Sequence, residues 1–191
     1  MKSLRLPCLS GLLLVSALII AAEPTGKEWE QEQNLSLNKE RPTSILGSFP
    51  NQVSSLGILP DTSSWHLSLD GDWKFNWVKR PEQRPVGFEK PSFDVSQWKT
   101  ITVPSCWQTQ GYDVPVYVNQ QYIFKRDWPK VMGEPPKNYV TYENRNPVGS
   151  YRREFEVRKN WKGQRVVIHF DGVDSFFYLW INGKYVGFSK D

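Results

Sequence analysis

The chain has 191 residues and a formal net charge of +4 at pH 7, and aromatic residues make up 14% of it, including 9 Trp. A basic excess this small, without a run of Lys and Arg or the spacing of zinc ligands, excludes nucleic acid as the expected partner. Apolar content concentrated in large rings favours strands and sugar-contacting surfaces over helices. The isolated basic pairs Lys79-Arg80 and Arg152-Arg153 are expected to be solvated charges.

Residues 1–22 have the layout of a secretory signal peptide. A basic start precedes the apolar stretch Gly11–Ile20, and the small residues Ala21-Ala22 stand before Glu23. The alternative is a membrane anchor, but this stretch is well short of the roughly 20 apolar residues that cross a bilayer. We therefore predict no membrane span, a secreted or periplasmic protein, and a mature chain that starts near residue 23.

The cysteines give little chemistry. Cys8 lies in the predicted leader, so Cys106 is alone in the mature chain and no intramolecular disulfide can form. A cysteine nucleophile needs a neighbouring base, and only His66 and His169 are present, so this function is weakly supported. We expect Cys106 to be a packed small residue.

Residues 23–64 are polar and rich in Ser, Pro and Gly towards their end, which predicts an arm and not a core. The only regular structure expected there is one or two helical turns over Glu28–Gln33. The folded domain is therefore predicted to span residues 65–191.

The first predicted strands lie near the start of this domain. Apolar residues take every second position on both sides of Asp70-Gly71-Asp72, which predicts two short strands about a turn. The segment Phe88–Trp98 carries Pro, Ser and Asp and is expected to be a loop. Ile101 and Val103 then alternate up to Pro104, which indicates a third strand.

A long irregular stretch rich in Tyr, Asn, Pro and Trp lies between Trp107 and Pro147. A connection of that length inside a compact domain is usually functional. We therefore expect ligand contacts in this stretch. Strands are predicted to resume over Tyr151–Val157 and Arg165–Phe170, where His169 falls on a sheet face and is expected to be structural.

The strongest local signal is a β-hairpin. Two alternating runs, Phe176–Ile181 and Lys184–Ser189, flank Asn182-Gly183, and both turn residues tolerate the positive φ of a type I′ turn. Several short strands without a convincing helix indicate an all-β sandwich or jelly roll. Because the sequence given stops at Asp191 without a closing strand, we expect this sandwich to be incomplete at its C-terminus.

Five blocks of the sequence, in the same order, resemble the N-terminal, galactose-binding-like jelly-roll domain of glycoside hydrolase family 2 enzymes of the β-galactosidase type. The blocks are Ser68–Phe75, Val103–Gln108, Gly111–Asn119, Asn146–Phe155 and Phe170–Asp191. The resemblance implies a hydrolase of terminal β-D-galactosides such as lactose. In that family immunoglobulin-like domains and a (β/α)8 barrel follow, and the two catalytic carboxyl groups lie on the barrel, so no catalytic residue is assigned here and this chain alone is expected to be inactive.

Within the family's pattern, Asn119 and Asp191 match the two positions of this domain that reach the active site. The resemblance also implies that Asp191 helps to bind a sodium ion, and that a divalent cation, Mg²⁺ or Ca²⁺, lies in the missing catalytic region. These roles suit the residue types, because sugar hydroxyls pair with an amide that both donates and accepts and with a carboxylate that accepts. The expected partners are a β-galactoside and the enzyme's downstream domains, and the oligomeric state stays open.

The sequence departs from the family at two places: the loop Lys125–Asn144 is longer than usual, and Cys106 replaces a residue that is often Asn. Two alternatives remain. The chain could be a stand-alone carbohydrate-binding module, or a fragment of another family 2 hydrolase, a β-glucuronidase or β-mannosidase. The first would stack sugars on the exposed rings of Tyr112, Tyr117, Tyr122 and Trp128.

Overall fold

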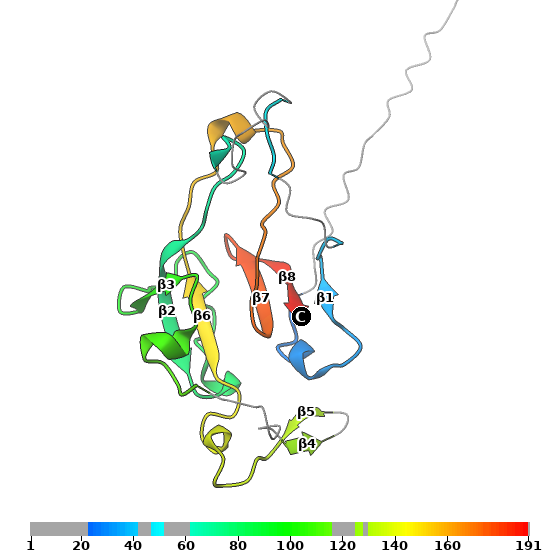
Figure 1. Ribbon diagram of the computed structural model, residues 1–191, viewed down its shortest axis with the longest axis vertical. Coiled ribbons are helices and arrows are strands. Elements are labelled where there is room, and N and C mark those ends of the chain that lie inside the picture. Colours follow the sequence, from blue (N-terminus) through cyan, green and yellow to red (C-terminus); the bar gives the residue numbers. More distant parts are fainter. Residues whose placement is uncertain (1–22, 42–46, 52–61, 116–124, 128–129, 191) are drawn as a thin grey trace, which may run out of the picture.

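The computed structural model describes residues 23–41, 47–51, 62–115, 125–127 and 130–190. Their strands form two three-stranded antiparallel sheets and a small two-stranded sheet, with strand order β1-β8-β7, β3-β2-β6 and β4-β5 (Figure 1). The connections contain short 3-10 turns and, within the described ranges, no α-helix. These turns are η1 (Glu28–Glu30), η4 (Pro81–Gln83), η5 (Trp107–Gln110), η6 (Val140–Tyr142) and η7 (Lys159–Trp161).

The all-β prediction is thus confirmed, as is a helical turn at the start of the arm. The predicted leader, residues 1–22, lies outside the described residues. No helix within the described ranges is both long and apolar enough to cross a membrane.

The first sheet is built on β2 (Gly71–Val78), which pairs with β3 (Lys99–Val103) on one side and β6 (Val148–Arg152) on the other. The predicted third strand is therefore confirmed as β3. Alternation along β2 and β3 directs Phe75 and Ile101 into the interior, where each is 1% exposed. This sheet supports the centre of the described core.

An aromatic cluster packs around Phe75. Its ring meets Tyr112 edge to face at 4.8 Å between centroids, and lies 4.6 Å from Tyr151 and 6.3 Å from Trp107, the first residue of η5. Such pairs add to the free energy gained by burial. Tyr112 is therefore a half-buried packing partner of β2, and its alternative use as a sugar-stacking ring stays a prediction.

Only one strand forms where two were predicted about Asp70-Gly71-Asp72, because no described strand pairs with the segment before Gly71. Its carbonyl groups are satisfied by side chains. The Arg153 guanidinium donates to the carbonyls of Leu69 and Asp70 at 2.9 and 2.8 Å, and the indole N–H of Trp73 donates to that of Leu69 at 2.8 Å. Backbone acceptors that side chains satisfy do not need a neighbouring strand.

The neighbouring arginine holds a loop in the same way. Arg152 donates to the carbonyls of Lys90, Pro91 and Phe93 at 3.2, 2.8 and 2.8 Å. The prediction that Arg152 and Arg153 are solvated charges is therefore wrong, since both guanidinium groups hold backbone.

The second sheet contains the predicted hairpin, β7 (Phe176–Ile181) and β8 (Lys184–Lys190). Asn182 and Gly183 have φ of 52° and 77°, which confirms the type I′ turn. The third strand was not predicted. It is β1 (Ser36–Leu37) of the arm, which pairs with the free edge of β8 and lies beside it in Figure 1.

The predicted strand over Arg165–Phe170 does not form, and β6 ends at Arg152, before Val157. No described strand pairs with residues 153–157 or 165–170, and Val166 and Val167 are 52% and 58% exposed. Alternation predicts a strand only where a second backbone is present to pair with it. His169 is accordingly exposed, 3.1 Å from the carboxylate of Asp171, and not on a sheet face.

Cys106 precedes η5, and its side chain is exposed. The prediction of a packed small residue is therefore wrong. Its backbone carbonyl instead accepts hydrogen bonds from the amide and the hydroxyl of Thr109, at 3.1 and 2.7 Å, which closes the 3-10 turn.

Candidate functional site

The two predicted sugar contacts, Asn119 and Asp191, both lie outside the described residues, so their roles stay predictions. The structure shows what leads up to each of them. Asp113 and Pro115 stand before the segment that contains Asn119, and Lys190 immediately precedes Asp191. The described regions that lead up to them are the loops around Asp113 and the end of β8 with the arm beside it.

The arm holds the end of β8 through backbone and side chains. The amide of Lys190 donates to the carbonyl of Leu35 at 2.8 Å, and its ammonium group donates to the carbonyl of Gln31. From the arm, Lys39 reaches the hydroxyl of Ser189 at 2.9 Å. Burial lowers the pKa of Lys190. The last described residues of β8 are thus fixed by the arm.

Glu28 anchors the arm to β7. Its carboxylate accepts hydrogen bonds from the amides of Thr25, Gly26 and Lys27 at 2.7, 3.1 and 3.1 Å, and from the hydroxyl of Tyr178 at 2.5 Å. Burial alone would raise the pKa of Glu28, but the bonds from Tyr178 and Thr25 lower it to about 2. Burial, followed by the bond to Glu28, raises the pKa of Tyr178.

We expect the arm to loosen in acid. A carboxylate whose folded pKa of about 2 lies below its ordinary value of 4.5 stabilises the fold above pH 4.5 and loses that contribution as the pH falls towards 2. Unfolding of wild type and Glu28→Gln should therefore be compared from pH 7 to pH 2. The stability difference between them should shrink below about pH 4.5. A constant difference across this range would contradict the assigned role.

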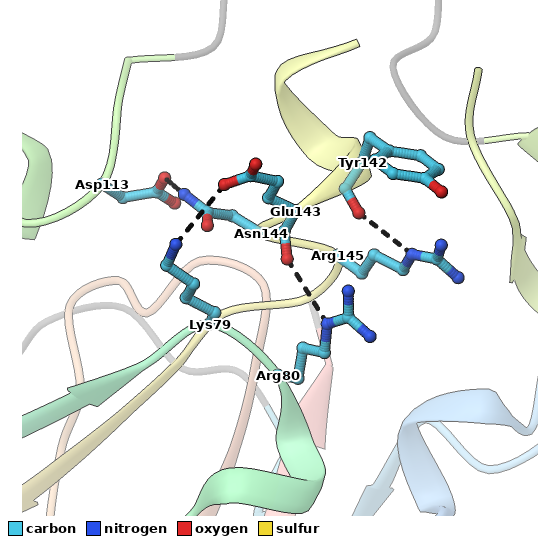
Figure 2. Close-up of polar contacts among 7 residues, drawn as sticks. All are labelled: Lys79, Arg80, Asp113, Tyr142, Glu143, Asn144 and Arg145. Atoms are coloured by element: carbon cyan, nitrogen blue, oxygen red, sulfur yellow. Dashed lines mark hydrogen bonds and ion pairs between the residues drawn. The ribbon is translucent and has the colours of Figure 1, made fainter. Parts of the chain in front are cut away.

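Around Asp113, loops from three parts of the chain meet (Figure 2). The side-chain amide of Asn144 donates to the carboxylate of Asp113 at 2.6 Å. Next to it, the ammonium group of Lys79 lies 3.5 Å from the carboxylate of Glu143, and Arg80 donates to the backbone carbonyl of Glu143 at 3.4 Å. The end of β2 is thereby joined to the segment that follows η6.

Arg145 fixes the last residue of η6. Its Nε donates to the backbone carbonyl of Tyr142 at 3.1 Å, and its guanidinium lies 5.0 Å from the centroid of the Tyr142 ring. The guanidinium also forms a 2.7 Å ion pair with Glu134. Figure 2 shows Arg145 alongside Tyr142. Such a cation over an aromatic face contributes roughly 0.5–1 kcal/mol at an exposed site.

These loops line an open surface cavity of about 340 Å³, which we call the loop cavity. It is lined by Lys79, Val114, Lys137, Tyr139, Tyr142, Glu143 and Asn144. It lies within the long stretch where ligand contacts were predicted, but its tyrosines were not among the rings considered. The signal that could have identified them is the spacing of Tyr139 and Tyr142, three residues apart after Pro135-Pro136.

Within the described ranges, no three His, Cys, Asp or Glu side chains gather into a group that could hold a metal ion. The predicted sodium ligand Asp191 is outside those ranges, so the sodium site stays a prediction. The divalent cation was predicted for a region that this sequence does not contain.

Comparison with known proteins shows similarity to one family of glycosyl hydrolases. The family model for glycosyl hydrolases family 2, sugar binding domain, matches residues 67–191. A β-galactosidase of Priestia megaterium is 37% identical over 165 residues, which is 86% of this chain and 15% of that protein. A β-galactosidase of Vibrio cholerae is 43% identical over 131 residues, or 69% and 12%. The chain thus spans about 15% of the length of such relatives.

Proposed function

Because this chain belongs to glycosyl hydrolase family 2 and carries its sugar-binding domain, we propose that it is the N-terminal part of a β-galactosidase that hydrolyses terminal non-reducing β-D-galactose residues, as in lactose. The observation that carries the proposal is the similarity to β-galactosidases over 86% of the chain. The long polar arm and the all-β domain that follows it are compatible with that role.

In the proposed enzyme this domain binds and orients the sugar and performs no bond cleavage. A retaining glycosidase needs two carboxyl groups about 5–5.5 Å apart, and we place both in the region downstream of this chain. Asn119 would exchange hydrogen bonds with sugar hydroxyls, and Asp191 would accept them. A sodium ion, when bound, would supply a fixed positive charge for sugar oxygens, and Asp191 would be one of its oxygen ligands.

The two three-stranded sheets would form part of a jelly roll, preceded by the arm of residues 23–64, of which β1 joins the second sheet. Residues 1–22 would be removed as a signal peptide on export, and the enzyme would then be secreted or periplasmic. N-terminal sequencing of the exported protein checks the cleavage.

The proposed sugar contacts can be tested in the longer protein that continues this reading frame. Asn119→Ala and Asp191→Ala should each lower kcat/KM on a chromogenic β-galactoside about 10- to 100-fold, the loss expected for one hydrogen bond to a charged or tightly held group. Lys162→Ala, an exposed position, is the control and should leave kcat/KM unchanged.

The chain of 191 residues should show no hydrolysis in the same assay. Hydrolysis by this chain alone would contradict the assignment of catalysis to a downstream region. Saturable sugar binding, combined with no hydrolysis by the longer protein, would identify a carbohydrate-binding module instead.

A further inference from the structure

We propose that the loop cavity binds a neutral saccharide ring, with Tyr139 and Tyr142 as its aromatic wall and Lys137 among its hydrogen-bonding groups. The inference deepens the proposed function and rests on it, because it assumes that the protein acts on sugars. It concerns residues other than Asn119 and Asp191, and it belongs to the loop in which this chain is longer than its family's usual pattern.

The local fold places both tyrosines on one side. Tyr139 is the residue before η6 and Tyr142 is its last residue, and the amide of Tyr142 donates to the carbonyl of Tyr139 at 2.9 Å. A further turn bond of 2.9 Å, from the amide of Tyr139 to the carbonyl of Pro136, precedes it. Both residues line the loop cavity.

The Tyr142 wall is ordered before any ligand arrives. Arg145 covers its ring at 5.0 Å and is itself held by the 2.7 Å ion pair with Glu134. A ring that is already fixed loses little conformational entropy on binding. Aromatic faces suit the C–H surface of a sugar ring, because they offer apolar contact of defined orientation.

The polar groups of the loop cavity are of mixed type. Lys79 and Glu143 form an ion pair at 3.5 Å with side chains 51% and 77% exposed, so the pair is weak and its atoms can exchange partners with a ligand. Lys137 has no hydrogen bond or ion pair with any residue in the described part of the chain and lines the same cavity. Sugar hydroxyls both donate and accept, so they can use ammonium donors and carboxylate acceptors together.

The same groups argue against other ligand classes. A phosphate or carboxylate would face the carboxylate of Glu143, which is already paired with Lys79, so that only the ammonium group of Lys137 is left to balance its charge. A wholly apolar ligand would remove water from Lys79 and Lys137 without replacing its hydrogen bonds, which is costly. A neutral ring carrying hydroxyl groups meets neither difficulty.

The direct test uses isothermal titration of the full chain with lactose, galactose and glucose. A single ring in a partly open cavity should bind with a Kd of about 1 mM. Tyr142→Ala should weaken binding at least about 10-fold, and Lys137→Ala, at an exposed position that does not threaten folding, about 3-fold. Lys162→Ala is the matched control for Lys137→Ala and should bind as the wild type does.

Two results would overturn the proposal: no saturation by any of the three sugars, or equal affinities for wild type, Lys137→Ala and a Tyr142→Ala variant whose near-ultraviolet circular dichroism is native. Neither depends on hydrolysis. Loss of hydrolysis by the longer protein with this binding intact would count against the proposed function and leave the loop cavity standing.

Kinetics of the longer enzyme show whether the bound saccharide is part of the substrate or a separate glycan. If the loop cavity holds the leaving sugar of the substrate, Tyr142→Ala should raise KM for lactose and leave KM for an aryl β-galactoside unchanged. If it holds a separate glycan, both KM values should stay unchanged while titration shows the loss of binding. In either case the ligand is a neutral saccharide bound at Tyr139 and Tyr142.

Discussion

Replacing Phe75 with alanine is expected to lower the free energy of unfolding by about 3–5 kcal/mol, the usual loss for a large aromatic residue in a well-packed core. Phe75 is 1% exposed, and its ring packs on Trp107, Tyr112 and Tyr151. Its removal would leave a cavity that the two strands beside β2 hold open. Urea unfolding followed by tryptophan fluorescence measures the effect as a lower midpoint.

Val86→Ala is the control for this experiment, because Val86 is 89% exposed and its truncation removes little buried surface. It should change the free energy of unfolding by no more than about 0.5 kcal/mol. Similar midpoints for Phe75→Ala and Val86→Ala would show that the aromatic cluster around β2 is not the core of the domain.

Replacing Gly187 with alanine is expected to detach the arm from β8. A Cβ atom added at Gly187 would lie 2.2 Å from the carbonyl oxygen of Leu37 and 3.0 Å from its carbon. Neither backbone can yield without breaking the β1–β8 ladder, in which Leu37 pairs with Phe188. Hydrogen exchange of the amides in β1, and of those in β8 that bond to the arm, should become at least about 10-fold faster, since local opening costs little once the ladder is lost.

Gly172→Ala is a matched control, because a Cβ atom there would have no neighbour within 4 Å. The hairpin bonds between β7 and β8 should persist in both variants, so the variant at Gly187 should keep its overall fold. Unchanged exchange in Gly187→Ala would mean that the arm does not pair with β8 in solution.

The parts of the fold that the sequence predicted well depend on local chemistry. Asn182-Gly183 favours a type I′ turn through its own backbone preferences, so the hairpin could be placed without knowing the rest of the chain. The Arg165–Phe170 segment shows the limit of this approach. Its alternation is as clear as that of β3, yet a strand also requires a partner, and alternation does not reveal one.

The unpredicted features depend on contacts between distant residues. β1 is two residues long and lies in a polar segment, so nothing in its own pattern announces that it pairs with β8. Arg152 and Arg153 look like any other basic pair until the loop and the segment before β2, whose carbonyls they hold, are placed beside them. The loop cavity likewise needs β2, Asp113 and η6 to be brought together.

The pairing of β1 with β8 also has a kinetic consequence. Side chains that join the arm to β8 are 150 positions apart in sequence, as in the contact between Lys39 and Ser189. At synthesis rates of about 5–20 residues per second, the arm therefore leaves the ribosome roughly 8–30 s before its partner strand exists. During that interval water must satisfy its backbone, which a polar segment tolerates well. Docking of the arm is thus expected to be a late folding step, and a nascent chain trapped before β8 emerges should lose its arm first to a protease.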